Sequence, residues 1–135
     1  MAAAGSTFLW DANVLIARAM ATHEHYAVVV DWTTQHPLFA TTPITQGSLV
    51  RYLVRTGNRA LKAAEVLARV TQRNGHEFWP DDVGYDRPML ARVHGHGDVT
   101  DAYLAQLARH HGGKLATLDR RLGDLHPDVT VVIPT

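Results

Sequence analysis

The sequence predicts an α/β domain in which a mostly parallel sheet is covered by helices on both faces. Short apolar runs alternate with longer stretches of helical periodicity, which is the pattern of strand–helix–strand units. The chain of 135 residues has the length of one domain, and we find no internal repeat or low-complexity segment. We therefore expect a single domain over residues 1–135.

The first third of the chain predicts two strands separated by two helices. Residues 7–10 form a short apolar run that ends at an acid, and apolar residues recur at helical spacing over 13–20. A second helix is expected over 26–35, because Pro37 disfavours helical backbone in the residue before it. Residues 38–41 then form the second predicted strand.

The middle of the chain predicts two helices and a third strand. Pro43 suits the first turn of a helix, and the helical pattern that follows is interrupted at residues 57–58 by Gly-Asn. The next helix is expected over 59–73, where the Asn-Gly pair at 74–75 signals a turn. A strand is predicted at 76–79.

The last third contains the clearest helix. Residues 80–97 hold two prolines, three glycines and three aspartates, so we expect mostly loop there, with a helical turn near 87–93. A helix is predicted over 99–110, because the glycines at 112–113 stand where a C-terminal glycine ends a helix. Two more strands are expected, at residues 114–117 and 129–133.

The composition excludes several classes of function. The chain has no cysteine, which excludes disulfides, thiolate zinc sites and thiol catalysis. No apolar run approaches the roughly 20 residues that cross a bilayer, and the first residues do not form a secretion signal. We therefore expect a cytoplasmic protein without membrane contact. Because the formal net charge is zero, a polyanion would have to bind at a local patch.

Three aspartates stand where predicted strands and helices meet. Asp11 follows the first strand, Asp119 follows the strand at 114–117, and Asp101 lies in the first turn of the helix at 99–110. The carboxyl ends of parallel strands share one edge of a sheet, where ligands bind. Carboxylates gathered there repel each other unless a cation lies between them, and Mg²⁺ or Mn²⁺ suits all-oxygen sites. The pattern predicts a metal-dependent enzyme acting on phosphate esters, with RNA as the favoured substrate.

Each acid also has a simpler explanation as a helix cap. Asp11 and Asp119 could cap the helices that follow them, as aspartate commonly does. Asp98 and Asp101 have the spacing of a capping box. We interpret Asp98 as a cap rather than as a metal ligand. Three acids at one edge still favour a metal site, because caps need no common edge.

Two polar residues could support the acids. The Asn13 amide could fix Asp11 or a water molecule, with an exposed or capping amide as an equal alternative. The Thr117 hydroxyl could hydrogen-bond a neighbouring carboxylate, or Thr117 could be an ordinary strand residue.

Basic residues offer candidate contacts to RNA phosphates. Arg51 is the best placed of the arginines spaced along the chain from 51 to 73, and Arg120 and Arg121 stand beside Asp119. Solvated helix surface is the common alternative for such charges. Of nine histidines, the clusters at 23–25 and 94–98 lack the ligand spacing of a zinc site, so we interpret them as surface histidines.

The chain resembles the PIN-domain ribonucleases of the VapC toxin type, from bacterial toxin–antitoxin pairs. Four matching pieces occur in the family's order and spacing along nearly the whole chain. They are residues 9–15, 42–51, 99–105 and 112–119. The resemblance implies a three-layer α/β/α domain with a Mg²⁺ pocket, in which the family's first acid falls on Asp11, the acid of its "DAY" segment on Asp101 and its last acid on Asp119. It also implies endoribonuclease activity on structured RNA such as tRNA or rRNA, a homodimer and a cognate antitoxin.

One position departs from the family pattern. The family often has glutamate where this chain has Gln46, at the start of a helix. Glutamine keeps a carbonyl oxygen as a ligand but removes one negative charge, which weakens the attraction for a cation and most of all for a second one. We therefore expect either a single tightly held ion or an impaired enzyme. The substitution Gln46→Glu is predicted to strengthen Mg²⁺ affinity.

Two other functions compete with the nuclease. The first is a catalytically impaired PIN-like module that only binds RNA or a protein. The second is an aspartyl-nucleophile phosphatase, because Asp11 follows a strand as the nucleophile does in those enzymes; that class usually carries a second aspartate where this chain has Asn13.

Overall fold

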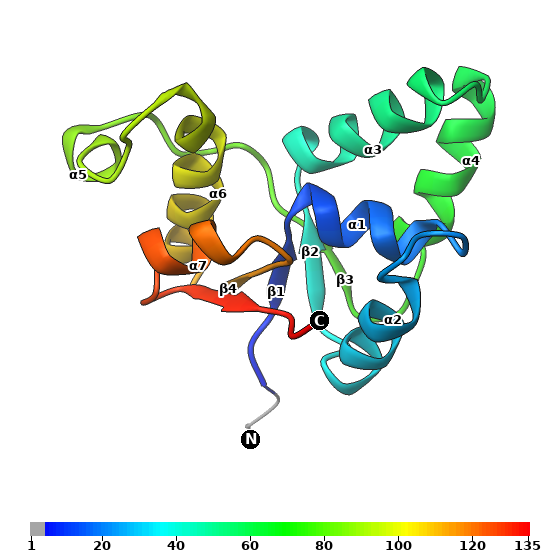
Figure 1. Cartoon of the computed structure of the whole chain (residues 1–135), viewed down its shortest axis with the longest axis horizontal. Helices are drawn as coiled ribbons and strands as arrows, with labels where there is room; N and C mark the ends of the chain where they lie inside the picture. The colour runs from blue at the N-terminus through cyan, green and yellow to red at the C-terminus, as the bar shows by residue number, and fades with distance from the viewer. Residues whose placement is uncertain (1–4) are drawn as a thin grey trace.

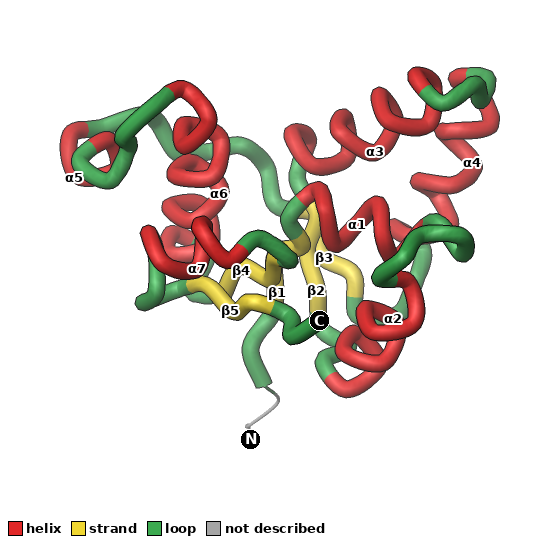
Figure 2. Tube along the Cα trace, in the orientation of Figure 1, coloured by secondary structure: helices red, strands yellow, loops and turns green. Residues whose placement is uncertain are grey.

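A five-stranded, all-parallel sheet forms the centre of the molecule in the computed structural model, which describes residues 5–135 (Figures 1 and 2). The strand order is β3-β2-β1-β4-β5. The strands are β1 (Phe8–Trp10), β2 (Phe39–Thr41), β3 (His76–Phe78), β4 (Lys114–Thr117) and β5 (Thr130–Val132). The predicted parallel sheet is thus confirmed.

Helices connect consecutive strands and cover both faces of the sheet. They are α1 (Ala12–Ala19), α2 (Tyr26–Gln35), α3 (Pro43–Arg55), α4 (Ala60–Thr71), α5 (Arg87–Leu90), α6 (Val99–His110) and α7 (Arg120–Leu125), with a 3-10 turn, η1 (His96–Asp98), before α6. The predicted bounds of α2, α6 and β4 agree with the structure, and the other bounds differ by a few residues. Among residues 5–135, no helix is both long and apolar enough to cross a membrane.

Two apolar clusters lie on opposite faces of the sheet. Helices α1 to α4 cover one face and helices α5 to α7 the other, as Figure 1 shows. Alternate residues of β1 belong to the two clusters. Phe8 and Trp10 pack with α1 to α4, and Leu9 packs with α6. Trp10 is 1% exposed and stacks on Phe39 with 4.0 Å between ring centroids. Burial of one such side chain contributes roughly 1.5–3 kcal/mol.

The connections place a topological switch between β1 and β4. From β1 the chain adds β2 and then β3 on one side, and afterwards crosses to place β4 and β5 on the other side. At such a reversal, open parallel sheets bind ligands in the crevice outside the carboxyl ends of the strands, which here are the ends of β1 and β4. Asp11 and Asp119 follow these two strands, so the topology brings both to that crevice.

Candidate active site

Asp11 is held at the junction between β1 and α1. Its side chain caps α1 by accepting a hydrogen bond of 2.7 Å from the backbone N–H of Ala12, and its own N–H donates to the Ala116 carbonyl. The residue is 7% exposed. Burial raises the pKa of Asp11; the bonds from Thr117 and Ala12 act in the opposite direction, and the charge of Asp119 raises the pKa further.

Thr117, the last residue of β4, connects the surrounding polar groups. Its hydroxyl donates to Oδ2 of Asp11 at 2.7 Å and accepts from the backbone N–H of Asp119 at 3.0 Å. It also lies 3.3 Å from Nδ2 of Asn13, and Oδ1 of Asn13 accepts from the backbone N–H of Leu118 at 3.1 Å. Asn13 therefore reaches Asp11 through Thr117, and the two side chains fix α1 against the turn between β4 and α7.

Asp101 and Asp119 complete a group of three acids with Asp11, and we call these three residues the acidic pocket. Asp119 caps α7 by accepting from the N–H of Arg121, so capping is compatible with a position at the crevice. Asp101 is half-buried in the first turn of α6, and its pKa is raised to about 6 by burial and then by the negative charges of Asp11, Asp119 and Asp98. The pocket therefore holds mutually repelling carboxylates.

The carboxylates of Asp11, Asp101 and Asp119 are too far apart for one ion to contact all three directly. In the described part of the chain, their oxygen atoms do not all approach within 4.8 Å of one another. An ion held by all three would therefore need a local adjustment of the side chains or an intervening water molecule.

Asp98 is the N-cap residue of α6, as predicted, but its side chain makes no capping hydrogen bond. The backbone of Asp98 is already helical because η1 runs into α6, so its side chain makes no capping bond to that helix. The carboxylate instead accepts from the N–H of His94 at 2.9 Å and from Nε and Nη2 of Arg121, both at 3.0 Å. This bidentate pair lowers the pKa of Asp98 to about 2.

Arg121 brings positive charge to the edge of the pocket. The side chain of Arg121 is 60% exposed although its partner Asp98 is buried, and its charge partly offsets the rise in the pKa of Asp101. Sequence reasoning named Arg121 only as a neighbour of Asp119. The pairing was missed because 23 positions separate it from Asp98, and no local spacing indicates such a contact.

Gln46, in the first turn of α3, contacts the end of β2. Its Nε2 donates to the Thr41 hydroxyl at 3.0 Å, and that hydroxyl is 2.7 Å from Nε2 of His76. Among the described residues, no hydrogen bond joins Gln46 to the three acids. Gln46 also lines an open groove of about 720 Å³ between α3 and α4, together with Arg51. Its effect on metal affinity stays a prediction.

The two arginines proposed for RNA contact lie on different helices. Arg51 is exposed on α3, and Arg120 is exposed at the start of α7, beside Asp119. Their role in binding RNA stays a prediction.

Comparison with known proteins identifies the family. The PIN domain family matches residues 8–126, and "Ribonuclease VapC29" of Mycobacterium tuberculosis is 54% identical over 130 residues, covering 96% of this chain and 98% of the relative. The chain belongs to the VapC family of PIN-domain ribonucleases. "Ribonuclease VapC39" of the same species is 38% identical over 132 residues, which cover 87% of this chain and 92% of that VapC protein.

Solved structures of the VapC family share the fold. VapC20 of M. tuberculosis, described as a sarcin–ricin loop cleaving toxin, superposes with a TM-score of 0.70 at 15% identity, covering 95% of this chain and all of the other. VapBC2 of Rickettsia felis, bound to a DNA fragment from its promoter, gives a TM-score of 0.66 at 14% identity, covering 95% of this chain and 99% of the other. The three-layer α/β/α arrangement expected from the resemblance is therefore confirmed.

Proposed function

We propose that this VapC-family chain is a Mg²⁺-dependent endoribonuclease and the toxin of a toxin–antitoxin pair. Asp11, Asp101 and Asp119 hold the ion, and Mn²⁺ can replace it. The observation that carries the proposal is the position of Asp11 and Asp119 directly after the neighbouring parallel strands β1 and β4, with Asp101 near enough that their charges raise its pKa. A divalent cation in the pocket would neutralise this concentration of negative charge.

The donor set fits magnesium. Carboxylate oxygens are hard ligands, and Mg²⁺ usually keeps several of its waters while one or two carboxylates bind it directly. Three acids whose carboxylates are well separated suit this mode of binding, in which water molecules fill the remaining coordination positions. When bound, an ion of this kind polarises a phosphoryl oxygen and lowers the pKa of water.

The residues around the acids have distinct positioning roles in this proposal. Thr117 and Asn13 orient Asp11 and the start of α7 through the hydrogen bonds described above. Asp98 orients the guanidinium of Arg121 at the pocket edge, where that side chain can bind a phosphate of the RNA.

The substrate of this proposal is a structured RNA, such as tRNA or rRNA. The relatives named as ribonucleases support RNA as the substrate class. Because the chain has no net charge, exposed arginines near the pocket must supply the attraction locally, and Arg120 and Arg51 are candidates for that contact.

The proposed partners are a cognate antitoxin and a second copy of the chain. The solved VapBC2 complex, whose fold this chain shares, supports an antitoxin partner. Apolar side chains on the outer surface of α3 and α4, among them Val54 (46% exposed) and Leu61 (81% exposed), are available for protein contacts. We place the complex in the cytoplasm, where the RNA is.

Cleavage by the purified chain tests this function. Sequencing of RNA 5′ ends after incubation with Mg²⁺ should show new ends at defined positions, and EDTA should suppress them. The Asp101→Asn variant should lose cleavage by about a hundredfold or more, because it removes the negative charge of one ligand of the ion while changing the side-chain volume very little.

The matched control is Asp124→Asn, which makes the same change at an exposed position of α7. It should cleave like the wild type. RNA binding without Mg²⁺-dependent cleavage would instead identify an impaired binding module, and a phosphorylated Asp11 would identify a phosphatase.

A further inference from the structure

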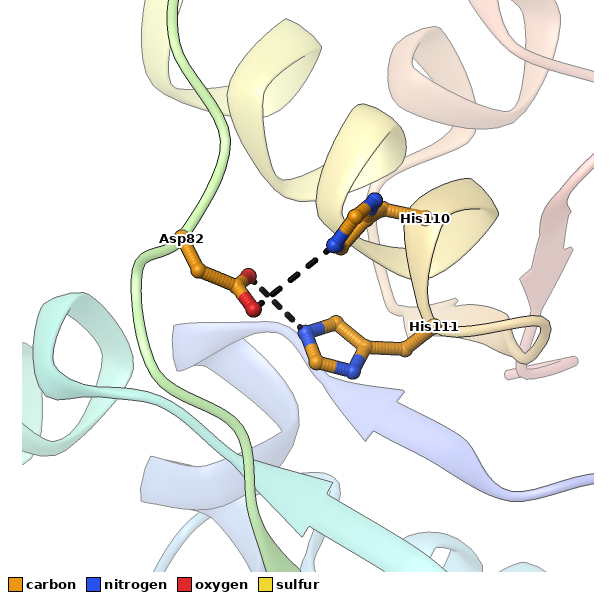
Figure 3. A group of neighbouring side chains, drawn as sticks. All are labelled: Asp82, His110 and His111. Carbon is orange, nitrogen blue, oxygen red and sulfur yellow. Dashed lines mark hydrogen bonds and ion pairs between the residues drawn. The ribbon is translucent and has the colours of Figure 1, made fainter.

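A second group of possible metal ligands lies at the opposite end of α6 from the acidic pocket. His110 ends α6, His111 follows it, and Asp82 belongs to the segment between β3 and α5 (Figure 3). One ligand atom from each residue lies within 4.8 Å of the other two. Nine residues separate Asp101 from His110, which is about 13 Å along a helix, so the two groups are distinct.

Both histidines direct the same ring nitrogen at the carboxylate. Nε2 of His111 is 3.0 Å from Oδ1 of Asp82, and Nε2 of His110 is 3.6 Å from Oδ2. The two rings are nearly perpendicular, at 88°, with centroids 5.1 Å apart. The nitrogens therefore approach Asp82 from two directions, as ligands around one ion do (Figure 3).

Packing holds one of these rings in place. His111 stacks on Trp79 with ring centroids 4.5 Å apart and an interplanar angle of 11°. Trp79 is 3% exposed and donates from Nε1 to Glu77, and a Cβ atom at Gly113 would come within 2.7 Å of its ring. The orientation of His111 is thus fixed before any ligand arrives, which reduces the entropy lost on binding.

The site is also open to ions from solvent. The side chains of His110 and Asp82 are 50% and 39% exposed, whereas that of His111 is 20% exposed. An ion can therefore reach the three ligands without any movement of the backbone.

We propose that Asp82, His110 and His111 bind a divalent transition-metal ion, with Zn²⁺ as the preferred ion. Two imidazoles and one carboxylate are a ligand set that zinc uses, and a water molecule would take the fourth position. Imidazole nitrogen favours zinc, nickel or copper over magnesium, so the site and the acidic pocket select different ions. Zinc bonds of about 2.0–2.1 Å place tetrahedral ligands roughly 3.3 Å apart. The two distances from histidine nitrogens to Asp82 oxygens, 3.0 and 3.6 Å, are close to that value.

The ion would have a structural role, because it would link the end of α6 on one face of the sheet to a segment that contacts α3 on the other face. Asp81, next to Asp82, accepts a hydrogen bond of 2.5 Å from the hydroxyl of Thr42, which precedes α3. The segment at 79–86 therefore already contacts the start of α3, and the ion would fasten the same segment to the end of α6. This role is independent of the proposed nuclease function.

Calorimetric titration of the full chain with Zn²⁺, in excess Mg²⁺, tests the proposal. The expected result is one zinc per chain, with the dissociation constant weakened about tenfold or more in Asp82→Asn and in His110→Ala. Zinc should also raise the melting temperature of the wild type by roughly 5 °C, and should not do so in these variants. Both changed residues are half-exposed, so the fold tolerates the substitutions.

The matched control is the double variant His23→Ala/His25→Ala. This pair also lies beside an acid, with Nε2 of His25 3.7 Å from Glu24 and ring centroids 5.7 Å apart. It should leave zinc binding unchanged, as should Asp101→Asn. No binding by the wild type, or equal binding by Asp82→Asn and the control, would overturn the proposal and leave Asp82 and the histidines as an ion pair only.

Discussion

Asp101 is a residue whose charge is unfavourable for the metal-free fold. Its pKa rises from 3.8 to about 6 on folding, because burial and the charges of Asp11 and Asp119 oppose ionisation. A raised folded-state pKa means that the folded chain binds the proton more tightly than the unfolded chain. The stability that this proton contributes is complete below about pH 4 and is lost as the pH rises through about 6.

The first prediction is that Asp101→Asn stabilises the metal-free protein at pH 7.5. One pKa unit corresponds to about 1.4 kcal/mol, and screening of this half-buried group reduces the expected gain to roughly 1 kcal/mol. Urea denaturation in EDTA measures it, and Asp124→Asn should show no gain. A loss of stability in Asp101→Asn would indicate that the carboxylate is needed for the fold, as a helix cap would be.

At the scale of elements, the pocket is built where helices begin. Asp11 and Asp119 cap the N-termini of α1 and α7, and Asp101 lies in the first turn of α6. The partial positive charge of a helix N-terminus favours carboxylates at these positions. Thr117 joins two of these elements, because its hydroxyl contacts Asp11 before α1 and Asp119 before α7.

The second prediction concerns Thr117→Val, which keeps the shape of the side chain and removes the hydroxyl. Buried polar groups then lose their partner, so the free energy of unfolding should fall by about 1–3 kcal/mol. RNA cleavage should fall as well, because Asp11 is no longer oriented. Thr130→Val is a control, since the Thr130 hydroxyl is buried without a hydrogen-bond partner. Equal stability and activity in both variants would contradict the role given to Thr117.

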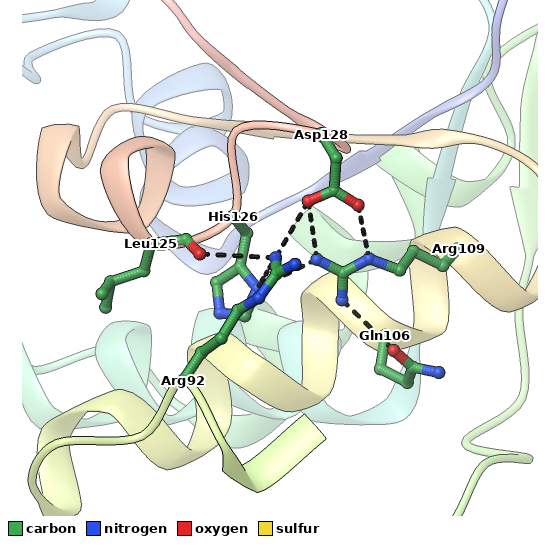
Figure 4. Close-up of polar contacts among 6 residues, drawn as sticks. All are labelled: Arg92, Gln106, Arg109, Leu125, His126 and Asp128. Atoms are coloured by element: carbon green, nitrogen blue, oxygen red, sulfur yellow. Dashed lines mark hydrogen bonds and ion pairs between the residues drawn. The ribbon is translucent and has the colours of Figure 1, made fainter. Parts of the chain in front are cut away.

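The other end of α6 is fixed by a charged network (Figure 4). Arg109 donates to both oxygens of Asp128, at 2.8 and 2.9 Å, and Arg92 donates to one of them at 3.0 Å. Both guanidinium groups also lie against Nδ1 of His126, at 3.1 and 3.4 Å. Because guanidinium only donates, Nδ1 must accept, which places the ring proton of a neutral His126 on Nε2.

The third prediction follows from the pKa of His126. Burial, together with the charges of Arg109 and Arg92, lowers that pKa below 6.5. The unfolded chain therefore binds this proton more readily, so stability is present above about pH 6.5 and is lost as the pH falls below it. Urea denaturation from pH 7 to pH 5 should show a smaller loss for His126→Asn, whose amide oxygen replaces Nδ1 as an acceptor. An unchanged pH dependence would contradict a neutral His126 in the fold.

At the scale of the whole molecule, the order of strands and helices could be predicted because local patterns determine it. Helix α6 has strong periodicity and ends at glycines, and it was predicted with its observed bounds. The meeting of Asp11 and Asp119 at one edge also followed from the sequence, because in a parallel sheet any residue after a strand lies at that edge.

Features that depend on distant contacts could not be predicted. Arg121 pairs with Asp98 across 23 positions, and Asp82 meets His111 across 29. Neither pair has a spacing that indicates contact. The side chain of Asp98 departs from the prediction for a local reason: the 3-10 turn η1 gives this N-cap residue helical backbone angles, and its carboxylate makes no capping bond to α6.

The proposed nuclease function requires that Asp11, Asp101 and Asp119 together hold a divalent ion. Anomalous diffraction from crystals of the chain grown with Mn²⁺ tests it most directly. We expect a peak in the pocket, with at least one of these carboxylates at a bonding distance of about 2.2 Å and the others linked directly or through ordered water. A pocket without such a peak at saturating Mn²⁺, or a peak only beside Asp82, would contradict it.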